Sequence, residues 1–467
     1  MHLLLSLLLA AAAPSDAPVE NALASAGPGT RIGLVVTDDQ GREIVAIRPD
    51  DRFVPASNTK MFTTAAAFAL LDPNAADGGG GATVRLDGRD VVIAGHGDAR
   101  LSSAADCVSD CLLDLARAVA ARTRVVHDVT GDDSAFPDER WPQGMSWNNM
   151  PSRYGTAISA LTIDDNVVTI VASPTTPGAA PGLVGDGYYT ILNRAVTGGG
   201  KSTLSVTREP GTDRLRITGS IPADSSPQTL TVGIDDPAYR AAWRLAALLR
   251  GLGVRVTGSI RAQHRPASAI DEPATRATAP APHPPQPVVL ARLAPPPLAE
   301  DLLVTSKVSQ NLHAELLLRR IGAITGSGSV ADGQVAVQAM LDSAGVERWS
   351  YEFADGAGMS NYNRLTPRAA VRFLRWTQAQ PWGAAWRATL PVGGVDGTLG
   401  RRFRGTALDG KLFAKTGKLN AANALSGFMI AASGKTLMFS ALANDMPGDA
   451  SATQAVDKAL LAVAAAN

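Results

Sequence analysis

A proline-dense segment divides this chain of 467 residues into unequal parts. Ten of the 30 prolines lie between Pro266 and Pro297, and residues 280–285 read PAPHPP. Because proline fixes φ and donates no backbone hydrogen bond, such a stretch favours extended chain over helix or sheet. The segment therefore predicts a domain boundary, and the length allows two or three domains.

Both ends of the chain contain strand-like segments. Residues 33–36 and 43–47 are largely apolar and flank the polar turn 38–41, which predicts a β-hairpin. Two further apolar runs, Leu425–Ala431 and Thr436–Leu442, lie near the other end. We expect the first and last segments to pair in a single sheet of an α/β domain that a long insertion interrupts. Helical patterns occupy residues 60–71, 298–321, 330–343, 367–378 and 450–465.

The insertion has a different character. After the glycine run 78–81, residues from 82 to 262 read as short strands separated by turns. Helical patterns within it are confined to residues 111–121 and 237–252. We therefore expect the insertion to be rich in β-strands.

Charge and hydropathy exclude several classes of protein. The 43 basic residues balance the 43 acidic ones without a long run of one sign, which disfavours a nucleic-acid partner or a polybasic membrane contact. The apolar run Leu3–Ala13 is too short to span a bilayer and reads as a secretory leader. We expect residues 1–17 to be a signal peptide, the mature chain to be exported to the periplasm or cell envelope, and no stable transmembrane segment to follow.

Cys107 and Cys111 are the only cysteines of the chain. In an oxidising compartment they could form a disulfide, although a separation of four residues on one helix would make the geometry awkward. Two reduced thiols are the alternative. No histidine or further cysteine lies nearby at ligand spacing, so we expect no metal site there.

The first motif with a chemical use is Ser57-Asn58-Thr59-Lys60, directly before a helical run. Residues i and i+3 lie on one side of a helix, so Ser57 and Lys60 would face each other. A serine hydroxyl is a weak nucleophile without an adjacent base, and a partly desolvated lysine can be that base. Free N–H groups at the helix start could also stabilise an oxyanion. With no such role, Ser57 would simply cap the helix.

Two further motifs follow in order. Ser309-Gln310-Asn311 lies within the helical pattern 298–321, where serine and asparagine are unfavourable unless they serve as a proton relay and an amide donor; a solvated helix face is the alternative. Lys415-Thr416-Gly417 lies in a segment that reads as an edge strand. A lysine there could hold an anionic group, and a glycine would let a substrate backbone pair closely with the strand.

The three motifs together are the signature of penicillin-recognising serine enzymes. Longer segments make the likeness more specific: PASNTK at 55–60, SQNLHAELLLR at 309–319, DGAGMS at 355–360 and LPVGGVDGTL at 390–399. With the long insertion between the first two motifs, the chain resembles the serine D-Ala-D-Ala carboxypeptidases and endopeptidases among the low-molecular-mass, class C penicillin-binding proteins. The resemblance covers essentially the whole mature chain.

This resemblance implies a multi-domain α/β fold. Its core would be a penicillin-binding, transpeptidase-like domain with a central antiparallel sheet flanked by helices, interrupted by β-rich inserted domains. The expected boundaries are residues 18–80 and 285–467 for the catalytic domain, 81–160 and 234–284 for the inserted β-rich domain, and 161–233 for a second β-rich insertion nested within it.

The resemblance also implies a DD-peptidase. It would hydrolyse D-Ala-D-Ala, or D-Ala-diamino acid cross-links, in peptidoglycan stem peptides through an acyl-enzyme on Ser57, with β-lactam antibiotics as covalent inhibitors and no metal or organic cofactor. Lys60 would be the general base, Ser309 would relay a proton to the leaving amine, and Asn311 would orient the substrate amide. The backbone N–H groups of Ser57 and Lys418 would form the oxyanion hole.

Two of the substrate-binding positions depart from the pattern of the relatives. The catalytic Lys415 would complete the electrostatics opposite Ser309 and attract the terminal carboxylate, beside the substrate-binding residues Thr416 and Gly417. Lys418 stands where relatives usually carry a small hydroxyl residue that helps to hold this carboxylate. Asn149 takes the place of an acid that, in several relatives, meets a cationic substrate side chain.

Two other functions share the same motifs. A β-lactamase or esterase would hydrolyse its acyl-enzyme quickly, and the long insertion argues against it. A catalytically idle peptidoglycan-binding protein would keep only the fold, and the intact serine, lysine and asparagine positions argue against it. Turnover of a D-Ala-D-Ala peptide separates an active peptidase from the idle protein.

Overall fold

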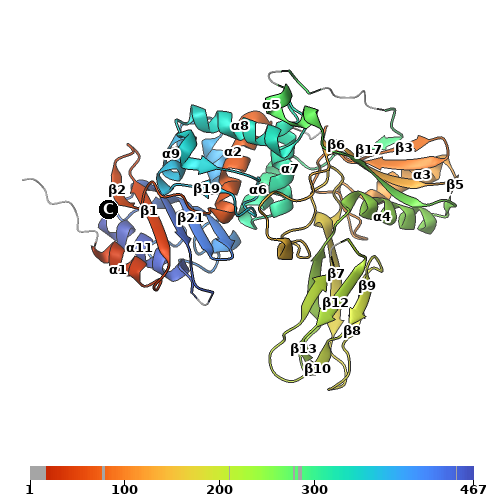
Figure 1. Cartoon of the computed structure of the whole chain (residues 1–467), viewed down its shortest axis with the longest axis horizontal. Helices are drawn as coiled ribbons and strands as arrows, with labels where there is room; N and C mark the ends of the chain where they lie inside the picture. The colour runs from red at the N-terminus through yellow and green to blue at the C-terminus, as the bar shows by residue number, and fades with distance from the viewer. Residues whose placement is uncertain (1–16, 76–78, 210, 277–278, 282–286, 449) are drawn as a thin grey trace, which may run out of the picture.

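The computed structural model describes residues 17–467 apart from 76–78, 210, 277–278, 282–286 and 449. The signal peptide predicted for residues 1–17 thus lies, except for its last residue, outside the described residues. Figure 1 shows the N-terminal and C-terminal parts of the chain side by side, with the inserted strands at the far end. No helix in the described part of the chain combines the length and the apolar composition needed to cross a bilayer.

The first and last segments of the chain meet in one antiparallel sheet of five strands, in the order β2-β1-β22-β21-β20. Strand β1 pairs with β22 from Arg31 opposite Asn444 to Thr37 opposite Met438, which confirms the predicted pairing. Strand β20 lies at the edge of the sheet. The strands are β1 (Arg31–Thr37), β2 (Glu43–Ile47), β20 (Leu412–Leu419), β21 (Ala422–Ile430) and β22 (Thr436–Asn444).

Helices cover both faces of this sheet. Leu34 and Val36 of β1 face α1 and α11, whereas Val35 between them faces the other helices, as the alternation of a strand requires. On that second face α2, an alanine-rich segment without glycine or proline, is buried over nine of its twelve residues. The helices are α1 (Ala17–Ala24) and α11 (Thr453–Ala466) on one face, with α2 (Thr59–Leu70), α6 (Leu298–Lys307), α7 (Asn311–Gly322), α8 (Val330–Ser343), α9 (Pro367–Gln378) and α10 (Gly383–Thr389) on the other.

The insertion is built on a second sheet of five strands, in the order β16-β6-β4-β3-β17. Strand β6 pairs in parallel with both β4 and β16. Helices α3 and α4 bury their apolar faces against this sheet (Figure 1). The elements are β3 (Thr83–Asp87), β4 (Asp90–Ala94), α3 (Leu112–Arg122), β5 (Val125–Val126), β6 (Val129–Pro137), α4 (Pro237–Gly251), β15 (Arg255–Val256), β16 (Ile260–Arg265), α5 (Pro273–Arg276) and β17 (Ala291–Arg292).

Between β6 and α4 the chain forms a separate group of short strands, which we call the nested insertion (167–233). Figure 1 shows it projecting from the rest of the molecule. Its small sheets, β14-β7-β8 and β11-β12-β9, enclose a core of few residues that includes Leu215 and Ile217. The strands are β7 (Val167–Ser173), β8 (Gly182–Val184), β9 (Thr190–Asn193), β10 (Val196–Gly198), β11 (Ser205–Arg208), β12 (Arg214–Thr218), β13 (Ser220–Pro222) and β14 (Gln228–Gly233).

Cys107 and Cys111 form a disulfide. The awkward geometry expected for two cysteines on one helix does not arise. Cys111 immediately precedes α3 with an extended backbone, and Cys107 lies in the turn before it.

Candidate active site

The serine and the lysine of the first motif lie next to each other. Ser57 belongs to the short 3₁₀ helix η1 (Ala56–Asn58), and Lys60 lies in the first turn of α2. Lys60 Nζ donates a hydrogen bond to Ser57 Oγ at 3.0 Å. Lys60 is fully buried, whereas Ser57 is partly exposed. The hydroxyl is therefore open to a substrate while its lysine partner is shielded from water.

The Ser-x-Asn motif lies at a break between two helices. The prediction of a continuous helix over 298–321 is wrong, because Ser309 adopts φ +63° and separates α6 from α7 while the apolar pattern continues across the break. Asn311 Oδ1 accepts a hydrogen bond from Lys60 Nζ at 2.6 Å. Ser309 Oγ accepts one from Lys415 Nζ at 2.8 Å. The break thus brings both polar side chains to the two lysines.

The third motif enters the site on the edge strand β20. Asn58 Nδ2 donates a hydrogen bond to the carbonyl of Lys415 at 2.7 Å, which ties η1 to this strand. Lys415 is fully buried. A Cβ at Gly417 would lie 2.7 Å from the carbonyl oxygen of Pro55, so only glycine lets the strand approach the serine segment this closely. The edge strand is therefore held directly against the serine segment.

The other predicted substrate-binding residues differ in their placement. Thr416 Oγ1 shares a hydrogen bond of 2.7 Å with Thr398 Oγ1, and Lys418 is exposed on the same strand. Asn149 lies in another loop, in the 3₁₀ helix η2 (Trp147–Asn149). Its carbonyl accepts a hydrogen bond from the N–H of Ser152, and its buried Nδ2 has no partner among the described residues. The structure joins the serine, lysine and asparagine positions of the three motifs, but these hydrogen bonds do not connect Asn149 to them.

Burial lowers the pKa of both lysines. It lowers the pKa of Lys60 to about 7, against the opposing charges of Asp355 and Glu315. Burial and the neighbouring Lys60 hold the pKa of Lys415 well below its ordinary range. With a pKa of about 7, Lys60 is neutral in roughly half of the molecules at neutral pH, so it can accept the proton of Ser57.

A buried glutamate holds the backbone that positions Lys60. Lys60 Nζ donates a third hydrogen bond to the carbonyl of Ala357 at 2.6 Å. Glu315, which is 2% exposed, accepts hydrogen bonds from the N–H groups of Gly356 at 2.9 Å and Ala357 at 2.8 Å. Its second oxygen accepts one from the buried Arg319 at 2.8 Å. Glu315 is therefore a positioning residue for the lysine.

Asp355 stabilises the same loop by accepting hydrogen bonds from its backbone. Its carboxylate accepts hydrogen bonds from the N–H groups of Gly358 at 2.8 Å and of Met359 and Ser360 at 2.7 Å each. Gly358 has φ +87°, and a Cβ there would lie 1.9 Å from the carbonyl oxygen of Ala56. The loop therefore packs against the serine segment at a position that only glycine can occupy.

Sequence reasoning assigned no catalytic role to Asn58, Glu315 or Ala357. All three fall inside the conspicuous segments PASNTK, SQNLHAELLLR and DGAGMS, so the signal was present. Their contacts run largely through backbone groups of distant segments, which a motif alone does not specify.

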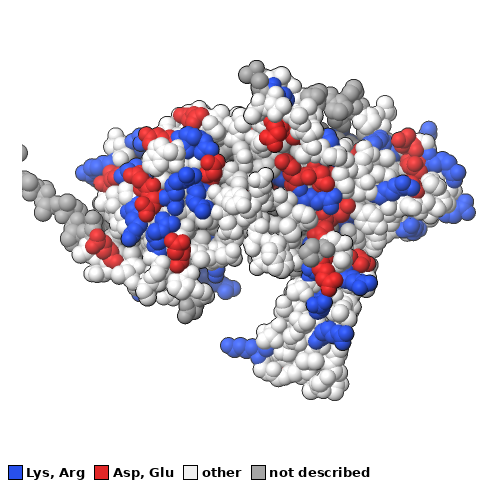
Figure 2. All heavy atoms as spheres, viewed as in Figure 1, with Lys and Arg blue, Asp and Glu red and all other residues white. Residues whose placement is uncertain are grey.

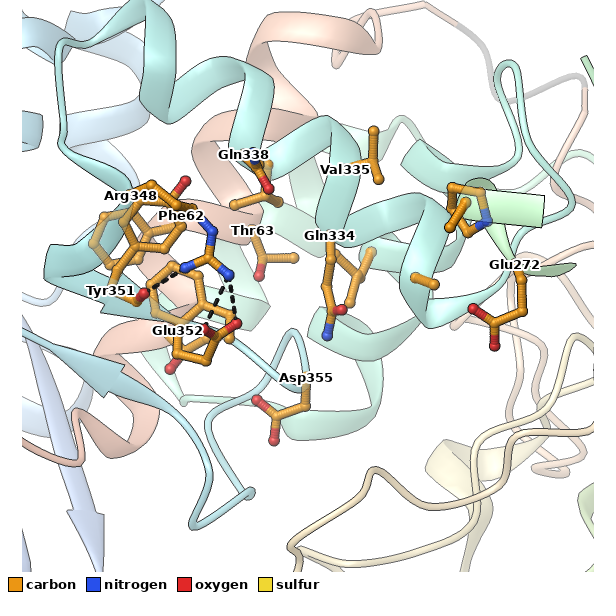
Figure 3. A pocket seen from close by; sticks show the side chains of 17 residues that line it. Phe62, Thr63, Glu272, Gln334, Val335, Gln338, Arg348, Tyr351, Glu352 and Asp355 are labelled. Carbon is orange, nitrogen blue, oxygen red and sulfur yellow. Dashed lines mark hydrogen bonds and ion pairs between the residues drawn. The ribbon is translucent and has the colours of Figure 1, made fainter. Parts of the chain in front are cut away.

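A cavity of about 260 Å³ lies beside α2 (Figure 3). Phe62 and Thr63 line it, with Asp355 at its edge, whereas Ser57 and Lys415 do not. It is therefore separate from the serine–lysine cluster.

The fold matches solved structures of penicillin-binding proteins. The chain is similar to penicillin binding protein 4 (dacB) from Haemophilus influenzae, with a TM-score of 0.78 and 21% identity over 94% of this chain and 97% of the other. A second structure of that protein, complexed with a β-lactam, gives a TM-score of 0.74 with 20% identity, covering 95% and 98% of the two chains. The fold is thus that of the penicillin-binding class, which confirms the predicted α/β architecture.

The sequence narrows this class to one family. Residues 16–467 match the model of the D-Ala-D-Ala carboxypeptidase 3 (S13) family, and the chain belongs to that family. It is 34% identical to a D-alanyl-D-alanine carboxypeptidase of Actinomadura sp., over 84% of this chain and 74% of the relative. The prediction of a serine-type D-Ala-D-Ala carboxypeptidase is confirmed at the level of the family.

Proposed function

We propose that this chain removes the C-terminal D-Ala from peptidoglycan stem peptides through an acyl-enzyme on Ser57, and that penicillin acylates the same serine. One observation carries the proposal: a buried lysine with a pKa of about 7 lies 3.0 Å from a partly exposed serine hydroxyl. The Actinomadura relative is a D-alanyl-D-alanine carboxypeptidase, and the Haemophilus protein forms a complex with a β-lactam; both support the proposal.

In the proposed reaction, Lys60 takes the proton of Ser57 as Oγ attacks the carbonyl of the penultimate D-Ala. The N–H groups of Ser57 and Lys418 stabilise the resulting oxyanion. Ser309, which accepts a hydrogen bond from Lys415 Nζ, passes a proton to the leaving amine of the terminal D-Ala. Water then hydrolyses the ester and restores the serine.

The two ends of the substrate meet different groups. Asn311 orients the amide that precedes the penultimate D-Ala, and Lys415 attracts the terminal carboxylate beside Thr416 and Gly417. The exposed Lys418 adds a second cation in place of a small hydroxyl residue. It adds charge attraction for this carboxylate, and the proposal includes hydrolysis of D-Ala-diamino acid cross-links alongside that of D-Ala-D-Ala.

We also propose that the protein works outside the cytoplasm, in the periplasm or cell envelope. The disulfide between Cys107 and Cys111 supports an oxidising compartment. The apolar run Leu3–Ala13 supports export.

The test is intact-protein mass spectrometry with penicillin, followed by peptide mapping and a time course of adduct loss, together with an assay of D-Ala release from a D-Ala-D-Ala peptide. We expect a persistent adduct on Ser57, D-Ala release, and neither in a folded Ser57→Ala variant. Rapid adduct loss with penicillin turnover would instead identify a β-lactamase. A folded protein with no adduct and no D-Ala release would be an idle binding protein.

A further inference from the structure

A loop of residues 143–155 is held against the active site by hydrogen bonds. The carbonyl of Tyr154 accepts a hydrogen bond from Asn311 Nδ2 at 2.8 Å, so the amide that bridges to Lys60 also holds this loop. At the other end of the loop, Ser360 Oγ donates to the carbonyl of Gln143 at 2.6 Å. The loop therefore forms one wall of the space around Asn311.

The same loop is also hydrogen-bonded to the nested insertion. Arg208 of β11 has a side chain that is only 1% exposed, pairs with Asp235, and donates to the carbonyl of Met150 at 3.3 Å. The N–H of Gly233 donates to the carbonyl of Pro151 at 2.9 Å. The loop is thus hydrogen-bonded both to the serine–lysine cluster and to the nested insertion.

A groove of about 870 Å³ lies between this loop and strands β9, β11 and β12. Trp147, Pro151 and Ser152 form its loop side, and Leu192 is among the residues opposite. Trp147 is 70% exposed and Leu192 is 44% exposed, so the groove presents apolar surface to solvent. A volume of this size accommodates several residues of a peptide.

The groove also carries a cation for which the described part of the chain supplies no counter-ion. Arg214 and Arg216 line it from alternate positions of β12, which place them on one face of the strand. Arg216 forms an ion pair with Glu209 at 2.9 Å, and the carboxylate of Asp213 accepts a hydrogen bond from Thr190. Among the described residues, the guanidinium of Arg214 has no ion-pair partner. Figure 2 shows basic side chains on the visible face of the nested insertion.

We propose that this groove binds the part of the stem peptide that precedes D-Ala-D-Ala, with Arg214 pairing with a carboxylate of that peptide. The inference rests on the proposed function. Asn311 marks the side of the site on which the preceding residues leave Ser57. Ser152 lies two residues before Tyr154, a span of at most about 7 Å, so a peptide leaving Asn311 reaches the groove within a few residues.

An acidic peptide fits this surface better than a neutral carbohydrate does. A guanidinium forms two parallel charge-assisted hydrogen bonds with a carboxylate, whereas a neutral sugar offers no charge to pair with it. The exposed Trp147 and Leu192 provide apolar contact for the intervening side chains.

The test compares two pentapeptides that end in D-Ala-D-Ala. One has a free side-chain carboxylate before the diamino acid, and in the other this carboxylate is amidated. The measured quantity is the ratio of kcat/KM for D-Ala release from the acidic and amidated peptides. We expect Arg214→Gln to lower this ratio about threefold to tenfold, and high salt to lower the wild-type ratio in the same direction. Lys201→Gln, which removes an exposed cation of the nested insertion outside the groove, is the matched control and should keep the wild-type ratio.

Binding of the same peptides to Ser57→Ala protein, followed by calorimetry, tests the groove without turnover. A preference for the acidic peptide that Arg214→Gln removes supports the proposal even if D-Ala release fails, in which case only the proposed function falls. An unchanged preference in Arg214→Gln overturns the proposal. Equal binding of both peptides, weakened by Trp147→Ala alone, would assign the groove to a neutral occupant and overturn it as well.

Discussion

The serine–lysine cluster and the nested insertion are built by different means. In the cluster, Lys60 Nζ donates to three acceptors from three separate segments of the chain, and the loop that supplies one of them is itself fixed by a buried glutamate. In the nested insertion a small core supports short strands with exposed side chains. Proton transfer demands atoms fixed from several directions, whereas recognition of a long substrate needs only a positioned surface.

The largest expected effect is the loss of penicillin acylation when Lys60, the proposed base in the serine–lysine cluster, is removed. We expect Lys60→Ala to slow penicillin acylation of Ser57 about a thousandfold, because the hydroxyl loses the group that takes its proton. Rapid-mixing measurement of the acylation rate checks this. The control is Lys435→Ala, which removes an exposed lysine in the turn between β21 and β22. An acylation rate in Lys60→Ala close to that of wild type would remove Lys60 as the base.

The next largest effect is a change in the pH dependence of penicillin acylation. Acylation by the wild type should rise as the pH passes through about 7, because Lys60 acts as a base only after it has lost its proton. Glu315 favours the protonated form, so Glu315→Gln should move this midpoint to lower pH. The acylation rate on the alkaline plateau should fall about tenfold, because the loop that carries Ala357 loses its anchor. Rate–pH profiles of penicillin acylation measure both changes.

Two further variants accompany Glu315→Gln. One tests whether Glu315 acts through its charge or through the position of its carboxylate, and the other is a control. Glu315→Asp keeps the charge but shortens the side chain, so it should preserve the midpoint better than it preserves the rate. Glu300→Gln removes an exposed acid of α6 and should change neither. Because Glu315→Gln leaves Arg319 buried without its partner, near-ultraviolet circular dichroism must first show that the variant is folded. A midpoint that stays at the wild-type value in folded Glu315→Gln would contradict the assigned role.

The smallest effect on catalysis is expected from the nested insertion. Ile217 is fully buried in its core, and Ile217→Ala should destabilise this region by about 2–4 kcal/mol while penicillin acylation stays within about twofold of wild type. Hydrogen exchange over residues 167–233 and the acylation rate measure the two effects. Ile217→Val, with a smaller loss of volume, should have an intermediate effect on exchange. A large loss of acylation would show that the two regions are mechanically coupled.

Much of the central fold was predictable from the sequence because its signals are local. Apolar runs around a polar turn predicted the first hairpin, and two further apolar runs predicted the strands near the other end. The spacing of Ser57 and Lys60 placed them on one side of a helix start. The break at Ser309 was not predictable, because a single residue in the left-handed region interrupts the helix without interrupting the apolar pattern.

The contacts that hold the loop around Ala357 could not be predicted from the sequence, for a different reason. Glu315 meets the N–H groups of Gly356 and Ala357, which lie about forty residues away along the chain, and no side-chain pattern encodes a contact with a backbone amide. The groove of the nested insertion likewise carries no motif. Arg214 is one arginine among many in the sequence, and only the fold shows that it lines the groove with no ion-pair partner among the described residues.

The pairing of β1 with β22 also determines when the enzyme becomes competent during its own synthesis. A ribosome releases Ser57 and Lys60 early, but Asn311 and Lys415 emerge only after the whole insertion, and β22 later still. Until those segments emerge, Ser57 and Lys60, the proposed nucleophile and base, lack the contacts that the later segments supply. A hydrolase with this connectivity completes the surroundings of its proposed catalytic serine only when nearly all of it has been made.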